Sequence, residues 1–537
     1  MEPGISKSVT VNRLLFLSVV LALYVVYFLN LGNMAFLGAD EPRYARIGEE
    51  MLRTADFVTP TLNSRPWLEK PPLLFWMGAL SFGLFGVSEE AARFPVALLG
   101  LLAALGCSYL LYRVHGRRAA LLGLLILSTS PLFFVYSRAA STDMPLAALL
   151  TLSLICAFQA HTTGRLSLAL VAGASLGLAT LAKGPVALLL GFGVLLGFRV
   201  LRSRPFCSAL QLTFGLLTLS VVTVPWFWLV WKANGYNFLA TFILNHHLAR
   251  YLTDLHHHAQ PFWFFLPVVL LGSFPWVVFL GSSILRIWRR PDSLFSENSG
   301  LLLYLWLWVL VPFLFFSFSE SKLAGYILPA VPPLSMLVAL EWDRLLSSEL
   351  TARKMLRIEL AFVSAAALLM GLTCLIGARI YYDSSWIGFL LGAPLLATGV
   401  LVHWPFRGYP LKTVFGILVG GMLVFVGIAY WQAAPEVSKF HSSKALMVEV
   451  RHRISRDEPI IFYRFFHHTA LYYSGYQALP EPIENLESLN AYIRDHPQDR
   501  YLVLTQKDGF RELSAKLGVS HFRAEGNQFL LEVESPH

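Results

Sequence analysis

Six acidic and five basic side chains gather between Gly38 and Pro72, in a chain in which charged residues make up only 14%. Strongly apolar runs flank the stretch, so its charges are concentrated beside a lipid-embedded region. Carboxylates in such a place can act as bases or orient a substrate, and fixed cations can stabilise a phosphate. The stretch is therefore the first candidate for a chemical site.

An amphipathic helix is expected to position the first of these groups. Pro42 suits the first turn of a helix, and Asp40 and Glu41 lie where carboxylates favour its amino terminus. Apolar residues from Tyr44 to Leu52 recur at helical spacing, which predicts a helix lying on the membrane surface with Asp40 aimed at the top of the bundle. Capping and membrane anchoring would explain the same residues, but they need fewer charges.

Two further motifs bring ionisable groups to the same level. RPWLEKPPLLFW places Glu69 and Lys70 ahead of two prolines that restrict the backbone, and a cation held there suits a lipid phosphate. A surface ion pair, worth about 0 to 1 kcal/mol, is the alternative. In YSRAASTDMPL, Asp143 either caps the following helix or takes part in the chemistry, and Arg138 is a second candidate phosphate ligand.

Histidines and a late loop complete the set of candidates. Five histidines between His246 and His258 would suit a metal such as Zn or Mg, with Asp40 or Glu69 as a carboxylate partner. Their spacing lacks the i, i+4 pattern of a zinc helix, so we do not expect a required metal. In FSFSESKLAGYILP, Lys322 and Tyr326 either hold an anionic headgroup or anchor the chain at the interface.

Composition places the whole chain in the membrane. The 537 residues have a mean hydropathy of +0.58 and a hydrophobic content of 56%, outside the range of soluble domains. The net charge of +9 comes from short basic clusters at the ends of apolar runs, which argues against a nucleic-acid partner. The first run, Leu14 to Leu31, is interpreted as a retained span rather than a signal peptide.

Apolar runs of membrane-spanning length predict thirteen transmembrane helices between Leu14 and Trp431. The run from Pro71 to Ser88 is rich in Gly and Pro and is placed at the interface. This arrangement puts eighteen Lys and Arg on one side and six in the short loops opposite, so the positive-inside rule places the amino terminus in the cytoplasm. The loop at 38–90, with two interfacial helices, then lies on the outer face.

The chain divides at the end of the last span into a transmembrane domain, 1–431, and a tail, 432–537. The tail reads as a small α/β domain on the outer face. Its predicted strands are Glu458–Phe466, Arg500–Thr505 and Gln528–Val533, and its predicted helices are Ile483–Asp495 and Gly509–Leu517.

The ordered motifs resemble those of the bacterial aminoarabinose (4-amino-4-deoxy-L-arabinose) transferase family, related to protein O-mannosyltransferases. They are DEPRYARIGEEML, LNSRPWLEKPPLLFW, STDMPL, HHHAQPFWFFLPVVLLGSFPW and FSFSESKLAGYILP. The resemblance covers nearly all of Leu14 to Trp431 and implies a polytopic α-helical membrane protein of GT-C fold with a periplasmic carboxyl-terminal domain. Glu320 and Ala324 depart from the pattern of many members, which leaves sugar and acceptor open.

The resemblance implies transfer of a sugar from undecaprenyl phosphate to an envelope acceptor at the bacterial inner membrane. Aminoarabinose transfer to a lipid A phosphate, with inversion, is the expected reaction. The resemblance implies that Asp40 and Asp143 are catalytic, that Arg43, Lys70 and Tyr326 bind the donor phosphate, and that Glu69 and His256 lie near any metal. By residue type, Arg138 and Lys322 are further candidates for the donor phosphate. Glu41, Tyr44 and Glu69 are predicted to bind substrate.

Two other functions fit the sequence less well. Another carrier-linked sugar, such as mannose or galacturonate, could be transferred to protein or to lipopolysaccharide core by the same residues. A lipid transporter would carry ionisable residues inside its spans, and the middles of these spans are almost free of them. Membrane lipid is a partner in every case.

Overall fold

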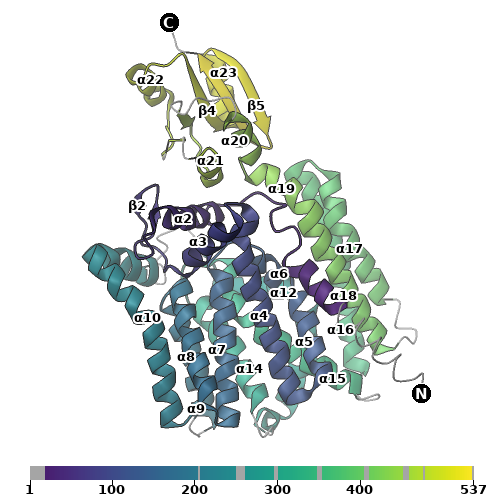
Figure 1. Ribbon diagram of the computed structural model, residues 1–537. Coiled ribbons are helices and arrows are strands. Elements are labelled where there is room, and N and C mark those ends of the chain that lie inside the picture. The colour runs from purple at the N-terminus through teal and green to yellow at the C-terminus, as the bar shows by residue number, and fades with distance from the viewer. Residues whose placement is uncertain are drawn as a thin grey trace, which may run out of the picture.

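The computed structural model describes residues 18–202, 206–249, 260–295, 300–347, 353–403, 410–451, 459–475, 478–479 and 481–534. A bundle of long helices carries two short helices across one end, and a small sheet domain lies beyond them (Figure 1). We call the end of the bundle that bears the short helices α2 (Asp40–Thr54) and α3 (Leu73–Phe85) the loop face.

The bundle is built from helices whose apolar residues cover most of their circumference, as expected for segments that face lipid and one another. Eight helices are long and apolar enough to cross a membrane among the described residues, or ten when each of two bent pairs counts as one span. In chain order the helices are α4 (Glu89–His115), α5 (Arg117–Ser128), α6 (Pro131–Ser137), α7 (Asp143–Thr163), α8 (Leu166–Lys183), α9 (Val186–Arg202), α10 (Ala209–Phe238), α12 (Phe265–Gly272), α13 (Leu280–Arg289), α14 (Leu301–Ser317), α15 (Val331–Ser347), α16 (Arg353–Tyr382), α17 (Ser385–His403) and α18 (Leu411–Ile428).

Each of the thirteen predicted spans coincides with one of these helices, with a bent pair, or with the first helix, described over Ser18–Tyr27. The sequence did not predict the bends, which are 69° between α5 and α6 and 103° between the α12 segment and the α13 segment. A proline stands at each break, Pro131 and Pro275, and proline cannot donate the backbone hydrogen bond that would continue a helix.

The two interfacial helices are confirmed as α2 (Asp40–Thr54) and α3 (Leu73–Phe85). At 13 residues α3 is about 20 Å long, too short for a hydrocarbon core of about 30 Å. Both lie across the loop face in Figure 1. Gly48 lets them approach closely, because a Cβ there would lie 3.3 Å from the carbonyl oxygen of Phe75.

A two-stranded hairpin, β1 (Thr61–Leu62) and β2 (Arg65–Pro66), follows α2. Its turn residues Asn63 and Ser64 have φ angles of 55° and 62°. The buried carboxylate of Glu50 accepts their two backbone N–H groups at 2.9 and 3.2 Å and the Thr61 hydroxyl at 2.7 Å. One acidic side chain therefore fixes the hairpin against α2.

The carboxyl-terminal domain contains a four-stranded sheet in the order β3-β4-β6-β5, with β3 parallel to β4 and the other pairs antiparallel. The predicted strands and helices are found as β3 (Ile460–Phe462), β4 (Arg500–Gln506), β6 (Gln528–Glu534), α22 (Leu486–Asp495) and α23 (Lys507–Lys516). The sequence analysis did not identify β5 (Val519–Glu525), α20 (Lys444–Arg451) or α21 (His468–Tyr473). A continuous helical run, Leu411–His441, crosses the predicted boundary at 431/432 and includes α19 (Ala434–His441).

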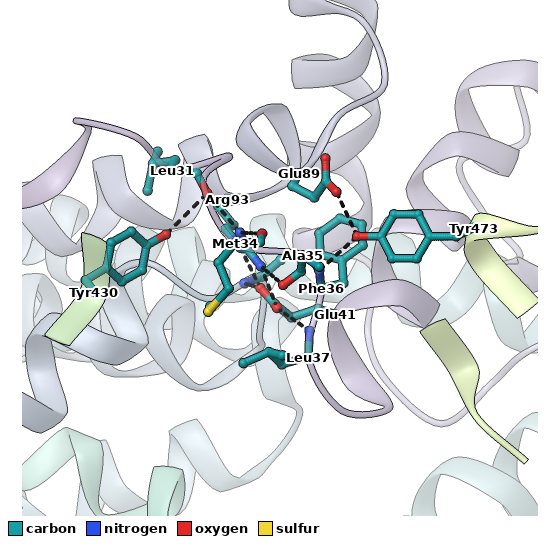
Figure 2. A network of polar contacts seen from close by, with 11 residues as sticks. Leu31, Met34, Ala35, Phe36, Leu37, Glu41, Glu89, Arg93, Tyr430 and Tyr473 are labelled. Carbon is teal, nitrogen blue, oxygen red and sulfur yellow. Dashed lines mark hydrogen bonds and ion pairs between the residues drawn. The ribbon is translucent and has the colours of Figure 1, made fainter. Parts of the chain in front are cut away.

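Tyr473 of α21 ties this domain to the membrane part (Figure 2). Its hydroxyl accepts the backbone N–H of Phe36 at 2.9 Å and donates to the Glu89 carboxylate at 2.7 Å. Lys444 pairs with the same carboxylate at 2.5 Å. The domain is thus docked on the segment before α2 and on the start of α4.

Replacing Tyr473 by Phe should loosen the docked domain. The variant removes the hydroxyl that accepts the Phe36 N–H and donates to the Glu89 carboxylate. Leaving such buried groups unpaired weakens the docking of the domain by about 1 to 3 kcal/mol. We expect faster release of the domain in limited proteolysis. The control is Tyr381→Phe, because Tyr381 is 82% exposed. Equal cleavage rates in the two variants would contradict the role given to Tyr473.

Candidate active site

The first charged pair of the site lies at the start of α2. Asp40 is its first residue, and its half-exposed carboxylate accepts a hydrogen bond from Arg43 at 2.6 Å. Arg43 also donates to the Ala39 carbonyl at 3.0 Å and lies 5.9 Å from the Trp67 ring. Burial acts to lower the pKa of Arg43, but the Asp40 carboxylate outweighs burial and the pKa is raised. The guanidinium group stays charged.

The second pair joins α7 and α8. Asp143 is the first residue of α7 and Lys183 is the last residue of α8, and their side chains form an ion pair with exposures of only 14% and 12%. The Lys183 ammonium also lies 4.3 Å from the centre of the Tyr326 ring. Asp143 and Tyr326, predicted separately, are therefore brought together through a lysine.

Two tyrosines connect the pairs. The pKa of Tyr44 is raised well above its ordinary value, first by burial and then by the Asp40 carboxylate, with smaller contributions from Asp143 and Glu69. Tyr136 lies within electrostatic range of both Asp143 and Asp40. The structure thus gathers Asp40, Arg43, Tyr44, Glu69, Asp143 and Tyr326 from the predicted set, and it adds Tyr136 and Lys183.

Glu69 and Lys70 lie half-buried at the edge of this group. The Glu69 carboxylate is 3.8 Å from Nε2 of His246. His256, the predicted metal partner, lies outside the described residues, and no group of three metal-ligating side chains occurs among those that are described. Glu69 and His246 are two groups that a divalent cation would accept, and two are fewer than a zinc site normally uses.

His468 reaches the same region from the carboxyl-terminal domain. Its pKa is lowered to about 4, first by burial and then by the positive charges of Arg43 and His467, while the Asp40 carboxylate opposes these effects. The imidazole is therefore neutral near pH 7. A residue more than 400 positions further along the chain shares the field of the Asp40–Arg43 pair.

Glu41, predicted to bind substrate, serves a structural role instead (Figure 2). It is 6% exposed, and its two oxygens accept Arg93 at 2.8 Å each. They also accept the backbone N–H groups of Leu37 at 3.0 Å and Ala140 at 2.9 Å. Arg93 gives its remaining donors to the carbonyls of Leu31, Met34 and Ala35.

All five N–H donors of Arg93 are used, the condition under which a buried charge is tolerated. The pair fixes both catalytic candidates, because Glu41 follows Asp40 directly and Ala140 lies three residues before Asp143. Glu41 is thus a positioning residue.

Two predicted phosphate ligands are also used elsewhere. Arg138 is 1% exposed, donates to the carbonyls of Val26 and Leu29, and stacks 4.0 Å from the Tyr430 ring. Lys322 is 5% exposed and donates to the carbonyls of Gln260 and Ser319. Backbone carbonyls at helix and loop ends hold these cations, so neither faces the paired carboxylates.

Sequence reasoning missed Lys183, Tyr136, Arg93 and His468 as residues of the site or its support. Lys183 carried a signal, because a lysine ends an apolar run in TLAKGP. Arg93 carried one too, since an arginine stands at the start of a span. Tyr136 and His468 have no local pattern that sets them apart.

The chain is similar in sequence to several known proteins. The family model for dolichyl-phosphate-mannose-protein mannosyltransferase matches residues 69–228. The chain is 30% identical over 390 residues to an undecaprenyl phosphate-α-4-amino-4-deoxy-L-arabinose arabinosyl transferase of Erwinia tasmaniensis, covering 71% of this chain and 69% of that protein. It is also 30% identical to a Proteus mirabilis transferase of that name, over 60% of this chain and 58% of that one.

The fold is that of solved relatives. The crystal structure of ArnT from Cupriavidus metallidurans bound to undecaprenyl phosphate aligns with a TM-score of 0.78 at 24% identity, covering 97% of this chain and 98% of that one. The alignment and the membrane-spanning helices place the chain among the polytopic membrane proteins of GT-C fold. On the match to the Erwinia protein, the chain belongs to the family of undecaprenyl phosphate-α-4-amino-4-deoxy-L-arabinose arabinosyl transferases.

Replacing Glu41 by Gln should destabilise the protein severely. The variant leaves the Arg93 cation buried without its countercharge, and breaking a buried pair in this way costs about 3 to 5 kcal/mol. We expect a lower unfolding midpoint in detergent and less monodisperse protein. Glu436→Gln, which disrupts the exposed pair with Lys439, is the matched control and should leave the midpoint unchanged. A Glu41→Gln midpoint equal to that of the control would refute the structural role.

Lowering the pH from 7.5 to 5 should destabilise the docked domain. The unfolded chain has a His pKa of about 6.5, whereas the folded His468 has one of about 4. Between these two pKa values the unfolded state therefore binds a proton that the folded state excludes. The stability of the domain decreases as the pH is lowered through this interval. The pKa of His467 is lowered as well, by burial and by His441, and acts in the same direction.

His468→Gln should reduce this decline in the unfolding midpoint. The exposed His496→Gln is the control and should retain the decline of the native chain. Identical pH profiles for all three proteins would exclude His468 as the cause.

Proposed function

We propose that this protein transfers 4-amino-4-deoxy-L-arabinose from undecaprenyl phosphate to a phosphate of lipid A. The observation that carries the proposal is the convergence of the Asp40–Arg43 pair of α2 and the Asp143–Lys183 pair of α7 and α8 around Tyr44 and Tyr136. The proposed identities of the sugar and of its lipid carrier are taken from the names of the relatives. Lipid A is the acceptor that the sequence resemblance implies.

We further propose that the loop face is periplasmic and that the amino terminus lies in the cytoplasm of a bacterial cell. From Glu89, which binds Lys444 of the carboxyl-terminal domain, α4 runs 27 residues, about 40 Å, to the opposite end of the bundle. Arg118 there pairs with Asp343, and Arg286 and Arg344 pair with Glu341. Basic residues concentrated at that end support a cytoplasmic location for it.

In the proposed reaction an oxygen of the acceptor phosphate attacks the anomeric carbon of the sugar. The bond from that carbon to the undecaprenyl phosphate oxygen breaks, and its electron pair leaves with the phosphate. Attack from the opposite side inverts the configuration. Arg43, Lys70 and Lys183 would stabilise the charge that develops on the leaving phosphate, and the Tyr326 phenol would bind its oxygens.

The carboxylates would orient the reactants. A hydroxyl acceptor would need Asp40 as a general base, whereas an acceptor phosphate is already an anion and needs mainly placement. Asp143 would hold Lys183 at its position beside Tyr326. We propose that no metal is required, with Zn or Mg at Glu69 and the neighbouring histidines as the alternative.

A second function is favoured by one observation. The protein mannosyltransferase model matches residues 69–228, which include Glu69, Lys70, Asp143 and Lys183. Transfer of mannose or galacturonate to protein or to lipopolysaccharide core would use the same ion pairs. Polyprenyl-phosphate donors bearing these sugars should therefore be tested beside aminoarabinose.

Asp40→Asn should lower the rate of transfer by at least about a hundredfold, because the neutral amide can neither act as a base nor hold Arg43 by charge. The assay uses purified protein in detergent, undecaprenyl-phosphate-linked aminoarabinose and lipid A, with mass spectrometry of the product. Asp56→Asn, in the same loop, is the matched control and should transfer at the native rate.

Transfer undiminished in Asp40→Asn would overturn the site while leaving the function. No transfer by the folded native chain would overturn the aminoarabinose assignment. The same assay in EDTA tests the metal proposal, since loss of transfer that added Zn or Mg restores would make the metal essential.

A further inference from the structure

A cavity of about 630 Å³ opens beside α2, away from the paired carboxylates. One wall is α2, contributing Arg46 and Arg53, and a second is the β1–β2 hairpin, from Leu62 to Trp67. Leu471 and Ala478 of the carboxyl-terminal domain close the third side. Two neighbouring segments of the chain and a third that lies more than 400 positions further along therefore line one cavity.

The cavity carries an excess of positive charge. Arg46 is offset by Glu49 at 3.2 Å and Glu50 at 2.9 Å. Arg53 and Arg65, by contrast, have no hydrogen-bond or ion-pair partner among the residues that the structure describes. Two guanidinium groups from different elements thus face the cavity without a countercharge, and guanidinium groups bind phosphates in a bidentate manner.

The cavity also contains an unmet polar group. The side-chain oxygen of Asn63 is buried and has no partner among the described residues. Its backbone N–H is already used by Glu50, which fixes the residue in place. An amide held in this way would suit a hydroxyl of a sugar headgroup.

A basic stripe links the cavity to the reacting pairs. Arg43, Arg46 and Arg53 recur along α2 at spacings of three and seven residues, which places them on one side of the helix. The helix rises 1.5 Å per residue, so Arg53 lies about 20 Å along the axis from Asp40. A phosphate at Arg53 is therefore not the phosphate that leaves or receives the sugar.

We propose that this cavity binds a phosphate-bearing part of the acceptor glycolipid, through Arg53 and Arg65, while another part of the same headgroup reaches Asp40. This inference rests on the proposed function for its acceptor. Leu471 and Ala478 line the same cavity as the two exposed arginines, so a ligand there would contact both the catalytic loop region and the carboxyl-terminal domain. This shape favours a defined headgroup over the phosphates of bulk phospholipid.

The first test is binding of lipid A to the full chain in nanodiscs, compared with binding of chemically dephosphorylated lipid A. The double variant Arg53→Gln/Arg65→Gln should weaken binding of the phosphorylated form by about tenfold to a hundredfold, the effect of losing charge-assisted hydrogen bonds. It should leave the dephosphorylated form unaffected. Arg494→Gln/Arg511→Gln, on the exposed surface of the carboxyl-terminal domain, makes the same change in net charge and should bind as the native chain does.

The second test separates acceptor from donor. Transfer kinetics of the Arg53→Gln/Arg65→Gln variant should show a KM for lipid A raised by a similar factor, with the KM for the donor and kcat unchanged. Neither arginine hydrogen-bonds to any residue in the described part of the chain, so the variant should remain monodisperse. A raised KM for the donor instead would assign the cavity to the carrier phosphate and overturn the proposal.

A competition experiment tests whether the cavity binds bulk membrane phospholipid or the acceptor lipid A. Excess phosphatidylglycerol in the nanodisc should not displace lipid A, and displacement would show that the arginines hold bulk phospholipid, contrary to the proposal. Unchanged lipid A binding in the variant would also overturn it. If the native chain binds phosphorylated lipid A through these arginines but transfers no aminoarabinose, the cavity assignment stands and the proposed function fails.

Discussion

The site depends on one buried ion pair, Arg93 with Glu41. Removing two charges from water is costly, and the cost is recovered only when every donor and acceptor finds a partner. Here the guanidinium meets the carboxylate and three carbonyls, and the carboxylate also accepts two backbone N–H groups. These contacts join the segment before α2, the start of α4 and the turn before α7. The positions of Asp40 and Asp143, the two carboxylates proposed to take part in transfer, depend on that junction.

Several features of the fold could be predicted because they depend on local pattern or on charge balance. The lengths of the apolar runs predicted the positions of the spans. The short, Gly-rich run that forms α3 was left out of the spans, and the positive-inside rule supported that choice. The strand β5 was not predicted because most of its side chains are exposed and it lies at the sheet edge, so it lacks the alternation of a half-buried strand.

The site was predicted in part for the same reason. Asp40, Arg43 and Tyr44 share one helix, so their proximity follows from helical spacing. Glu41, Arg138 and Lys322 are also charged, but they bind partners 52, 109 to 112, and 62 positions away. Such long-range partners decide whether a charge is available to substrate, and no local pattern reveals them. Lys183 and His468 enter the site by equally distant contacts.

The docking of the carboxyl-terminal domain limits how this architecture can be recombined. Tyr473 binds Glu89 and the backbone of Phe36, and Lys444 binds the same carboxylate. Because these contacts join the domain to the segment that leads into Asp40, the two regions form a single structural unit. A chimera that exchanged only the carboxyl-terminal domain between relatives would disturb the catalytic loop, whereas one that exchanged residues 31–93 together with that domain would preserve the joint.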